Sequence, residues 1–341
     1  MRTVPINLES RRIGLAAIRE AAASVYDAAI RTPLVRLDTR DLGPGFPPVP
    51  PDLEIYLKLE ALQPIGSFKI RGAYNAVRQL SPGELAAGVW TVSAGNAAQG
   101  VARAAQRVGA TASVMVMDTA PDTKIRAIER LGASIVRASY DECWRTVEAH
   151  GSDRMHGTFV HPFDDDRFIA GNATVALEIL DQLPDVDAIV APLGGGGLLS
   201  GIAAACAEVK PATRVYAAEP ATAAPLSVSM AAGRPEYFDG WTASFVDGAG
   251  GKSVLPTMWP MLARLSGSVV MPLDAVARAM RLVADRVHVI AEGAAGCAVA
   301  AALSGGAGRG RVVAVVSGGN IDLSVFASLV GACAPPGSAN A

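Results

Sequence analysis

The sequence LQPIGSFKIRGA occupies residues 62–73, and the interpretation of the whole chain starts from it. Its proline and first glycine predict a turn, and Ser67 is a favourable residue for a helix N-cap. Apolar residues then recur at helical spacing over residues 70–80. These signals predict that Lys69 lies in the first turn of a helix, where the positive end of the helix dipole disfavours an ammonium group.

A lysine in this environment is more readily neutral and nucleophilic than a lysine in water. We therefore expect Lys69 to hold an aldehyde cofactor as a Schiff base. The alternative is an exposed lysine near a helix start, and this stretch alone does not decide between the two.

Composition limits the class of protein. The 341 residues include 30 basic and 32 acidic side chains, so nothing in the net charge of −2 indicates binding to nucleic acid or to an anionic membrane. The length suggests about two domains. Charged residues make up 18%, below the usual value of about 25%, which favours extensive buried surface, either internal or between subunits. Together with the family resemblance described below, this favours a homodimer or larger homo-oligomer.

The four cysteines are scattered, which is typical of a reduced, cytoplasmic protein rather than a disulfide framework. The N-terminus has no apolar core of a signal peptide, and no run of 18 apolar residues predicts a membrane span.

Strand and helix patterns alternate along most of the chain, which predicts parallel sheets with covering helices. Predicted strands are 54–59, 89–92, 112–117, 134–137, 158–160, 187–191, 215–218, 268–271 and 311–316. Predicted helices are 10–31, the Lys69 helix closed by Ser81-Pro82-Gly83, 96–109, 121–131, 140–150, 166–183, the helix ending at 209, 257–265, 274–288 and 294–303, with 220–255 irregular.

This pattern predicts a small domain inserted into a larger one. We expect a discontinuous large domain (1–84 and 161–330), a small mobile domain (85–160) and a disordered tail (331–341). A cleft between the two domains is the default ligand site.

Four consecutive glycines, 194–197, lie between a predicted strand and a predicted helix. Backbone N–H groups at such a junction suit a phosphate, although a flexible turn is the simpler alternative. A nicotinamide dinucleotide is a rival ligand, because Glu219 follows the next strand where a ribose-binding acid would be expected. A nucleoside triphosphate loop fits less well, since only Gly251-Lys252-Ser253 matches it.

Two further loops follow predicted strands. Ser93-Ala94-Gly95-Asn96 can bind a carboxylate through free N–H groups, and Asn96 can donate to a phenolic oxygen. Ser317-Gly318-Gly319-Asn320 places a serine where it can bond a ring nitrogen without supplying a charge. An ordinary N-cap and an ordinary turn are the respective alternatives.

No metal site and no serine hydrolase is expected. The four histidines lack ligand spacing, and Asp164-Asp165-Asp166 is more typical of a solvated helix start than of a metal cluster. No G-x-S-x-G motif is present.

Together, the loops resemble the fold-type II pyridoxal-phosphate enzymes, specifically the threonine/serine dehydratase (ammonia-lyase) and serine racemase group. The matching segments are 63–73, 93–96, 194–197 and 317–320, with Thr32-Pro33-Leu34 near the start. Their order and spacing agree over about residues 15–330.

The resemblance implies an α/β fold of two open, twisted parallel-sheet domains with covering helices, similar to the β subunit of tryptophan synthase, with pyridoxal 5′-phosphate in the cleft. It implies that Lys69 forms the internal aldimine and later removes the α-proton. The other implied cofactor contacts are Phe68, Asn96 (to the 3′ oxygen), Gly194, Gly195, Gly196, Gly197 and Leu198 (to the phosphate), Ser317 (to the ring nitrogen) and Gly318. The implied substrate contacts are Ser93, Ala94, Gly95, Asn96 and Ala97, which would hold a carboxylate.

Several departures from the group refine the prediction. Racemases carry a serine where this chain has Ala94, so racemisation should be weak. The residue after Asn96 is commonly histidine in the group but is Ala97 here, so the usual substrate contacts need not apply. Glu219 matches one ligand of a cation site in the group, but the expected aspartate is Pro225, so no tight metal site is expected. From the chain length we expect no C-terminal regulatory domain like that of the biosynthetic threonine enzymes. The four glycines differ from the G-T-G-G-T loop of cysteine synthases, which makes β-replacement a less favoured reaction.

The predicted activity is dehydration and deamination of a β-hydroxy amino acid to a 2-oxo acid and ammonia. L-Threonine and L-serine are the first candidates, and a hydroxyaspartate or an aryl-serine is possible. The alternatives are a serine racemase, a nicotinamide oxidoreductase and a non-catalytic amino-acid-binding protein.

Overall fold

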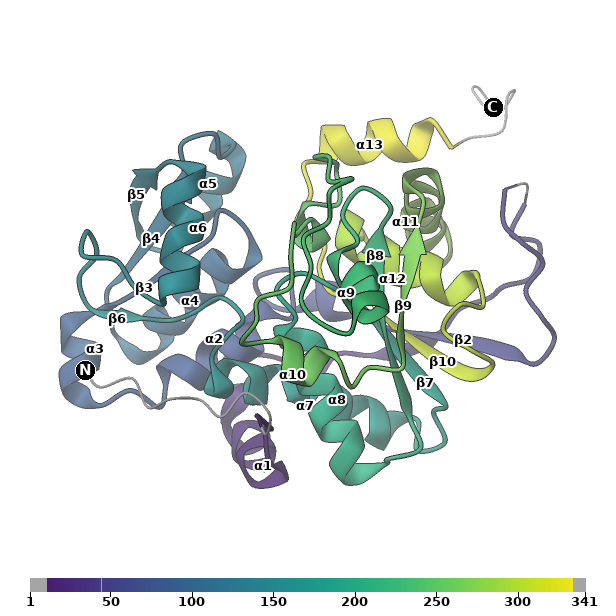
Figure 1. Ribbon diagram of the computed structural model, residues 1–341, viewed down its shortest axis with the longest axis horizontal. Coiled ribbons are helices and arrows are strands. Elements are labelled where there is room, and N and C mark those ends of the chain that lie inside the picture. Colours follow the sequence, from purple (N-terminus) through teal and green to yellow (C-terminus); the bar gives the residue numbers. More distant parts are fainter. Residues whose placement is uncertain (1–10, 44, 334–341) are drawn as a thin grey trace.

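The computed structural model describes residues 11–43 and 45–333, and their strands form two separate sheets (Figure 1). The larger sheet has the order β1-β2-β10-β7-β8-β9, and the smaller has the order β5-β4-β3-β6. Neighbouring strands pair in parallel except β1, which is antiparallel to β2. The larger sheet contains β1 (Leu34–Arg36), β2 (Leu53–Lys58), β7 (Ala188–Pro192), β8 (Arg214–Pro220), β9 (Gly267–Met271) and β10 (Gly310–Val315). The smaller contains β3 (Val89–Val92), β4 (Ala112–Met117), β5 (Ser134–Ala138) and β6 (Thr158–Phe159).

Helices cover both sheets. The smaller sheet packs against α4 (Asn96–Val108), α5 (Asp122–Glu129) and α6 (Tyr140–Ala149). The larger sheet packs against α8 (Gly197–Val209), α9 (Pro225–Ala232) and α12 (Gly293–Leu303). The remaining helices are α1 (Leu15–Ser24), α2 (Lys69–Val77), α3 (Pro82–Ala87), α7 (Asp166–Gln182), α10 (Trp259–Leu262), α11 (Leu273–Val287) and α13 (Leu323–Gly331), with 3-10 turns η1 (Val25–Asp27), η2 (Glu60–Leu62) and η3 (Asp247–Ala249).

Burial explains the composition of the central elements. Every residue of β7 is buried, as expected for a parallel strand covered on both faces. Every residue of α12 is also buried, because this small-residue helix packs on β7, β8 and β10 while α11 covers it from outside.

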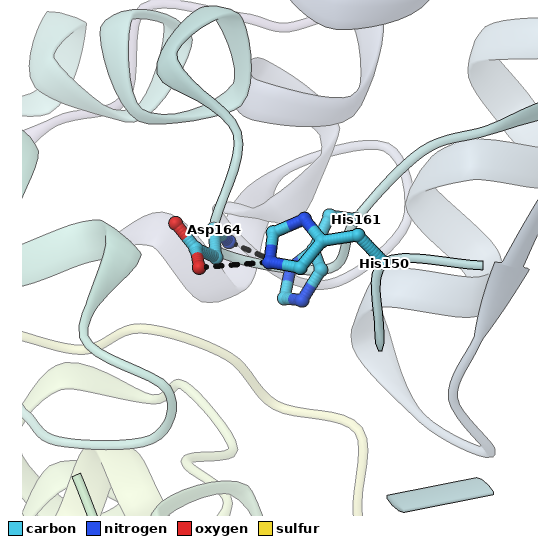
Figure 2. Close-up of side chains that lie close together, drawn as sticks. All are labelled: His150, His161 and Asp164. Carbon is cyan, nitrogen blue, oxygen red and sulfur yellow. Dashed lines mark hydrogen bonds and ion pairs between the residues drawn. The ribbon is translucent and has the colours of Figure 1, made fainter. Parts of the chain in front are cut away.

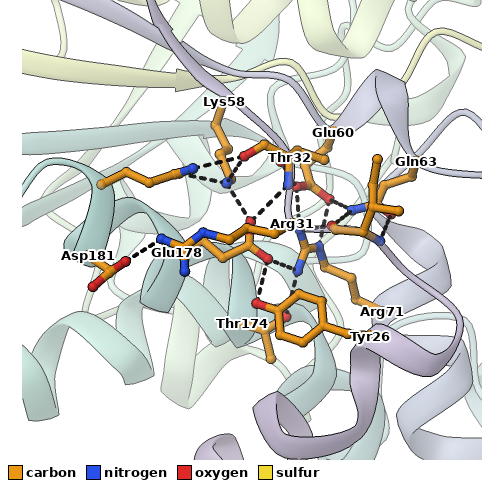
Figure 3. A network of polar contacts seen from close by, with 12 residues as sticks. Tyr26, Arg31, Thr32, Lys58, Glu60, Gln63, Arg71, Thr174, Glu178 and Asp181 are labelled. Atoms are coloured by element: carbon orange, nitrogen blue, oxygen red, sulfur yellow. Dashed lines mark hydrogen bonds and ion pairs between the residues drawn. The ribbon is translucent and has the colours of Figure 1, made fainter.

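A buried ionic network fixes α2, the helix that begins at Lys69 (Figure 3). The Arg71 guanidinium donates to both carboxylate oxygens of Glu60, each at 2.7 Å, and to Glu178 Oε1 at 2.6 Å. Lys58 Nζ donates to Glu178 Oε2 at 2.5 Å, and Tyr26 Oη donates to Glu178 Oε1 at 2.8 Å. Two cations thus face two carboxylates, and they join α2 to β2 and α7 in a region closed to water.

Several predicted elements differ from the structure. The helix predicted at 10–31 is the shorter α1 followed by η1, and 220–255 contains α9. Ser81 does not merely close the Lys69 helix: it starts α3 as the N-cap of a capping box with Glu84. The strand β1 and the helix α13 had no counterpart in the sequence prediction.

The domain boundaries and the mobility of residues 85–160 stay predictions, although β3–β6 all fall within that segment. Of the tail predicted at 331–341, only residues 331–333 lie in the described part. All four cysteines are free, and within residues 11–43 and 45–333 no helix is both long and apolar enough to cross a membrane.

Candidate active site

A cavity of about 430 Å³ lies where the carboxyl ends of strands from both sheets meet. Its lining includes every cofactor and substrate residue predicted from the sequence except Gly318. These lining residues are Phe68, Lys69, Ser93, Ala94, Gly95, Asn96, Ala97, Gly194, Gly195, Gly196, Gly197, Leu198 and Ser317. Gly318 is outside the lining but next to it, since an added Cβ would meet Oε1 of Glu292, a lining residue, at 2.6 Å.

Lys69 is the first residue of α2, and its partly buried side chain has no hydrogen-bonded carboxylate among the described residues. Its Nζ donates to the backbone oxygen of Pro162 at 2.6 Å and lies 5.4 Å from the centroid of the Phe68 ring. Burial lowers the pKa of Lys69 to about 8, and the negative charge of Glu292 opposes this shift in part. The leading cause is thus burial, whereas the sequence argument invoked the helix dipole.

The start of α2 also differs from the prediction. Phe68, not Ser67, is the N-cap, and no side chain caps the helix. The Ser67 hydroxyl is buried without a hydrogen-bond partner among the described residues. Backbone contacts hold the turn instead, since Phe68 N–H donates to Ser317 O at 3.0 Å and Ser67 forms a bridge with Gly318. The turn before Lys69 is thereby joined to the loop that begins at Ser317.

The four glycines form a turn in which side chains have no room. A Cβ on Gly195 would meet the Phe163 ring at 2.2 Å, and one on Gly194 would meet the backbone oxygen of Gly248 at 2.7 Å. Gly196 has φ of +93°, a conformation that glycine adopts readily. The loop then opens α8, whose first N–H groups have no carbonyl partner within the helix. The result is a backbone cradle with a positive dipole end, which fits a phosphate group.

An amide and a carboxylate connect the two sides of the cavity. Asn96 Nδ2 donates to Glu292 Oε1 at 2.8 Å, and Asn96 Oδ1 accepts from Asn320 Nδ2 at 2.7 Å. Burial, with a smaller contribution from the charge of Asp247, raises the pKa of Glu292 to about 8. The sequence reasoning missed Glu292. The available signal was a lone acid directly before an otherwise apolar helix, where a helix N-terminus favours negative charge.

The loop after β3 leaves the start of α4 open. Ser93 Oγ accepts from Gly95 N–H at 3.1 Å, so its hydroxyl stabilises the turn. The N-cap of α4 is Gly95, which has no side chain to occupy the N–H groups of the first turn. That these N–H groups bind a carboxylate stays a prediction.

A second group of lining residues was not predicted. It is contributed by β3, β4 and α6 and is mainly apolar. Its members are Val92, Met115, Met117, Tyr140, Cys143, Trp144 and Val147. No single motif marks these positions, because each is an ordinary apolar residue of a strand or helix.

The structure brings together three side chains that the sequence spacing did not connect (Figure 2). Ligand atoms of His150, His161 and Asp164 all lie within 4.8 Å of one another. His161 Nδ1 accepts from Asp164 N–H at 2.7 Å and its Nε2 contacts Val147 O at 3.2 Å, so both ring nitrogens are engaged. The Asp164 carboxylate contacts Arg11, Thr257 and His150. Both ring nitrogens of His161 and the Asp164 carboxylate are thus engaged in hydrogen bonds, and His150 is engaged through Nε2.

The prediction that Asp164-Asp165-Asp166 is a solvated helix start is wrong for Asp164. Asp164 is buried, not solvated, and its pKa is lowered because hydrogen bonds from His150 and Thr257 and the Arg11 charge outweigh burial. Asp165 is the N-cap of α7, as its position suggested. The cluster also supports the segment that carries Pro162, the partner of the Lys69 amine.

Glu219 lies outside the cavity lining. Its buried carboxylate accepts from the N–H groups of Leu226 at 2.8 Å and Ser227 at 2.9 Å and from the Ser268 hydroxyl. A carboxylate engaged in this way does not face a nucleotide ribose in the cavity. The geometry therefore gives no support to the nicotinamide alternative.

Comparisons with known proteins agree with this geometry. A family model described as "Pyridoxal-phosphate dependent enzyme" matches residues 25–318. The L-threonine ammonia-lyase of Thermotoga maritima is 37% identical over 281 residues, which are 81% of this chain and 70% of the relative. Serine racemase of Homo sapiens is 36% identical over 324 residues, which are 92% of each chain.

Among solved structures, maize serine racemase superposes with a TM-score of 0.82 at 30% identity. The match covers 95% of this chain and 98% of that one. Family model, relatives and fold therefore agree, and the chain belongs to the family of pyridoxal-phosphate dependent enzymes with the type II fold.

Proposed function

We propose that this protein catalyses the β-elimination of water from a β-hydroxy amino acid, giving a 2-oxo acid and ammonia. Ammonia-lyases and racemases are similar to the chain at nearly the same identity, so the cavity itself must distinguish the two reactions. The observation that carries the proposal is Ala94 in the loop that lines the cavity. Its methyl group cannot give or take the second proton that racemisation requires, whereas elimination needs one base at Cα.

The residues of the cavity fit pyridoxal phosphate. The glycine turn has space only for backbone, and the first N–H groups of α8 would hold the phosphate. Lys69 would bind the aldehyde carbon, and Ser317 and Asn96 would contact the ring. When bound, the cofactor supplies an electron sink that makes the Cα–H of an amino acid acidic.

Lys69 is the base in this proposal. With its pKa lowered to about 8, about a tenth of the amine is neutral at pH 7, far more than for a lysine in water, and a neutral amine can accept the α-proton. The Pro162 oxygen orients the amine but carries no charge that would hold it permanently protonated. Removal of the proton and its later return to solvent or product can thus take place at Lys69 Nζ.

Ser317 favours elimination over a long-lived carbanion. A hydroxyl can hydrogen-bond to a ring nitrogen without placing a full charge beside it, unlike a carboxylate. With weaker withdrawal of electrons into the ring, loss of the β-hydroxyl competes better with reprotonation at Cα. The start of α4 meanwhile would hold the substrate carboxylate through backbone N–H groups.

The experiment uses purified protein with added pyridoxal phosphate. We expect a visible absorption band that is lost in Lys69→Ala, and 2-oxo acid formation from L-threonine, L-serine or another β-hydroxy amino acid. A colourless protein would count against cofactor binding. A coloured protein that forms no 2-oxo acid across a panel including hydroxyaspartate and aryl-serines would favour a binding protein.

The variant Ala94→Ser tests the distinction from a racemase. A hydroxyl at position 94 supplies a proton donor, so we expect racemisation of L-serine to rise at least about tenfold from its basal level. Chiral chromatography of the recovered serine measures this change. Equal racemisation in the two proteins would contradict the role given to Ala94.

The proposal also includes the organisation of the protein. Residues 85–160 would form a small domain that moves toward the remainder when the substrate binds. The functional form would be a cytoplasmic homodimer or larger homo-oligomer.

A further inference from the structure

The unpredicted wall of the cavity is apolar, and it continues directly from the loop expected to hold the substrate carboxylate. Val92 immediately precedes Ser93, and the backbone oxygen of Met115 accepts from Ser93 N–H at 3.1 Å. Met115, Cys143 and Val147 are buried around it. This wall, defined as Val92, Met115, Met117, Cys143, Trp144 and Val147, presents no charged side chain to the cavity.

Aromatic rings and branched side chains extend the wall toward Lys69. Phe163 follows Pro162, whose oxygen holds the Lys69 amine, and its ring lies edge-on to His161 at 4.6 Å. Val254 and Leu255 add buried apolar side chains from the other side of the cavity. The apolar surface therefore adjoins both the carboxylate loop and the base, which is where the side chain of a bound amino acid must lie.

Trp144 is oriented for packing. Its indole N–H donates to Glu148 Oε1 at 2.9 Å, one turn further along α6. The polar edge of the ring is thus occupied outside the cavity. The carbon surface of the partly exposed ring is left to line the cavity.

Apart from Lys69, two cations line the cavity within the described ranges, and both are already engaged. Lys124 Nζ forms an ion pair with Asp247. Lys252 Nζ lies 4.7 Å from the centroid of Tyr140 and 4.3 Å from that of Trp241. A substrate with a second carboxylate, such as hydroxyaspartate, would have to displace one of these contacts or pack a charge against the apolar wall.

We propose that the amino acid bound here carries a large apolar, preferably aromatic, substituent on Cβ, as in 3-phenylserine. This inference rests on the proposed function for the reaction and on the wall for the side chain. A methyl group or a hydrogen in place of the ring would leave the partly exposed Met117 and Trp144 side chains facing water, whereas an aryl group would cover them.

The reaction balances without an oxidant or reductant. The Cα–H and Cβ–O bonds break, the Cα–H electron pair ends in the new Cα–Cβ double bond, and water leaves. Hydrolysis of the released enamine returns that water, giving phenylpyruvate and ammonia. Lys69 Nζ takes up one proton from Cα and the departing hydroxyl takes up one proton to leave as water, so the elimination neither gains nor loses a proton overall.

Binding of unreactive amino acids tests the wall separately from catalysis. L-Phenylalanine, L-alanine and L-aspartate have no β-hydroxyl to lose, and spectral titration of the cofactor-loaded protein gives their dissociation constants. We expect L-phenylalanine to bind about 10- to 100-fold more tightly than L-alanine, from burial of its ring. Equal binding, or tighter binding of L-aspartate, would overturn the inference.

Variants locate the effect in the wall. Trp144→Leu should reduce the preference for L-phenylalanine over L-alanine, taken as the ratio of their dissociation constants, at least about fivefold, and an unchanged ratio would contradict the assignment. Trp259→Leu is the matched control, because Trp259 is a partly buried tryptophan outside the cavity lining, and it should retain the preference. Loss of the preference in the control alone would contradict the assignment.

Turnover measurements test the lyase reaction and the preference for an apolar side chain separately. A kcat/KM for L-threo-3-phenylserine at least about tenfold above that for L-threonine would support the inference. A higher value for L-threonine would overturn it and leave the proposed lyase function intact. If no β-hydroxy amino acid reacts but L-phenylalanine still binds selectively, the lyase function fails and the substrate class stands.

Discussion

Lys58 is fully buried and Lys69 is partly buried at the cavity, eleven positions further along the chain, and their surroundings differ. Lys58 Nζ donates to Glu178 Oε2 at 2.5 Å, to Thr32 O at 2.8 Å and to Gln182 Oε1 at 2.9 Å. Lys69 Nζ donates to a single backbone oxygen, that of Pro162.

Burial lowers the pKa of both side chains, but only at Lys58 does a contacting carboxylate oppose that shift. Lys58 therefore has three acceptors that hold an ammonium group in place. Lys69 has one neutral acceptor and a nearby charge, Glu292, that is itself easily protonated. The hydrogen-bond acceptors and charges around each amine, more than its burial, therefore distinguish a lysine that stabilises the fold from one that can react.

The largest effect should come from Lys69→Ala. We expect 2-oxo acid formation to fall at least about 1,000-fold, because both cofactor attachment and proton removal are lost. The thermal unfolding midpoint of the cofactor-free protein should stay the same or rise, since no ion pair is broken and a buried amine is removed. A large drop in that midpoint would mean that Lys69 also serves the fold.

Arg71→Met should have the next largest effect, on stability. It leaves Glu60 and Glu178 facing each other with one cation instead of two, and breaking such a buried pair costs about 3–5 kcal/mol. Urea unfolding of the cofactor-free protein measures the change. Arg78→Met, which removes a partly exposed ion pair with Glu20 at the end of the same helix, is the control and should cost less than about 1 kcal/mol.

Lys58→Met should be less damaging than Arg71→Met. Glu178 keeps its contacts to Arg71 and Tyr26, so we expect a loss of about 2–3 kcal/mol in the free energy of unfolding. Activity per folded molecule should be unchanged, in contrast to Lys69→Ala. Inactive but fully folded Lys58→Met would show that the two lysines are not separable in this way.

The smallest effect concerns pH. In the cofactor-free protein, the rate of capture of pyridoxal phosphate should rise with pH and level off above about 8, because the neutral form of Lys69 attacks the aldehyde. Glu292→Gln removes a negative charge that raises the pKa of Lys69, so the midpoint should move to lower pH by less than about one unit. A shift to higher pH would contradict the sign of this coupling.

Much of the fold and part of the site were accessible from the sequence. Most strands were predicted closely, for example 89–92 and 112–117. Buried parallel strands are continuous apolar runs, and here such runs alternate with helical patterns along the chain. Lys69, the glycine loop and the loops at 93 and 317 could be found because each has unusual local composition at a strand end. The sequence alone could not decide whether any of these loops was an ordinary turn.

The rest depends on contacts between distant segments. Glu178 meets Lys58 and Arg71, which are 120 and 107 positions away, and periodicity carries no information about such pairs. Trp144 and Met115 looked like ordinary core residues, since facing a cavity and facing a core require the same side chains. Ser81 illustrates a local ambiguity, because the same Ser-Pro-Gly can end one helix and cap the next.

The position of β10 has a consequence for biosynthesis. This strand pairs with β2 on one side and β7 on the other, yet it is the last strand to be synthesised. While the ribosome is still translating residues before 310, β2 and β7 lack their common neighbour, and the turn of Ser317 does not yet exist. The smaller sheet, contiguous within residues 89–159, has no such requirement and can form first. We therefore expect nascent chains to expose two apolar strand edges until translation is nearly complete, and cofactor capture to be the final step of maturation.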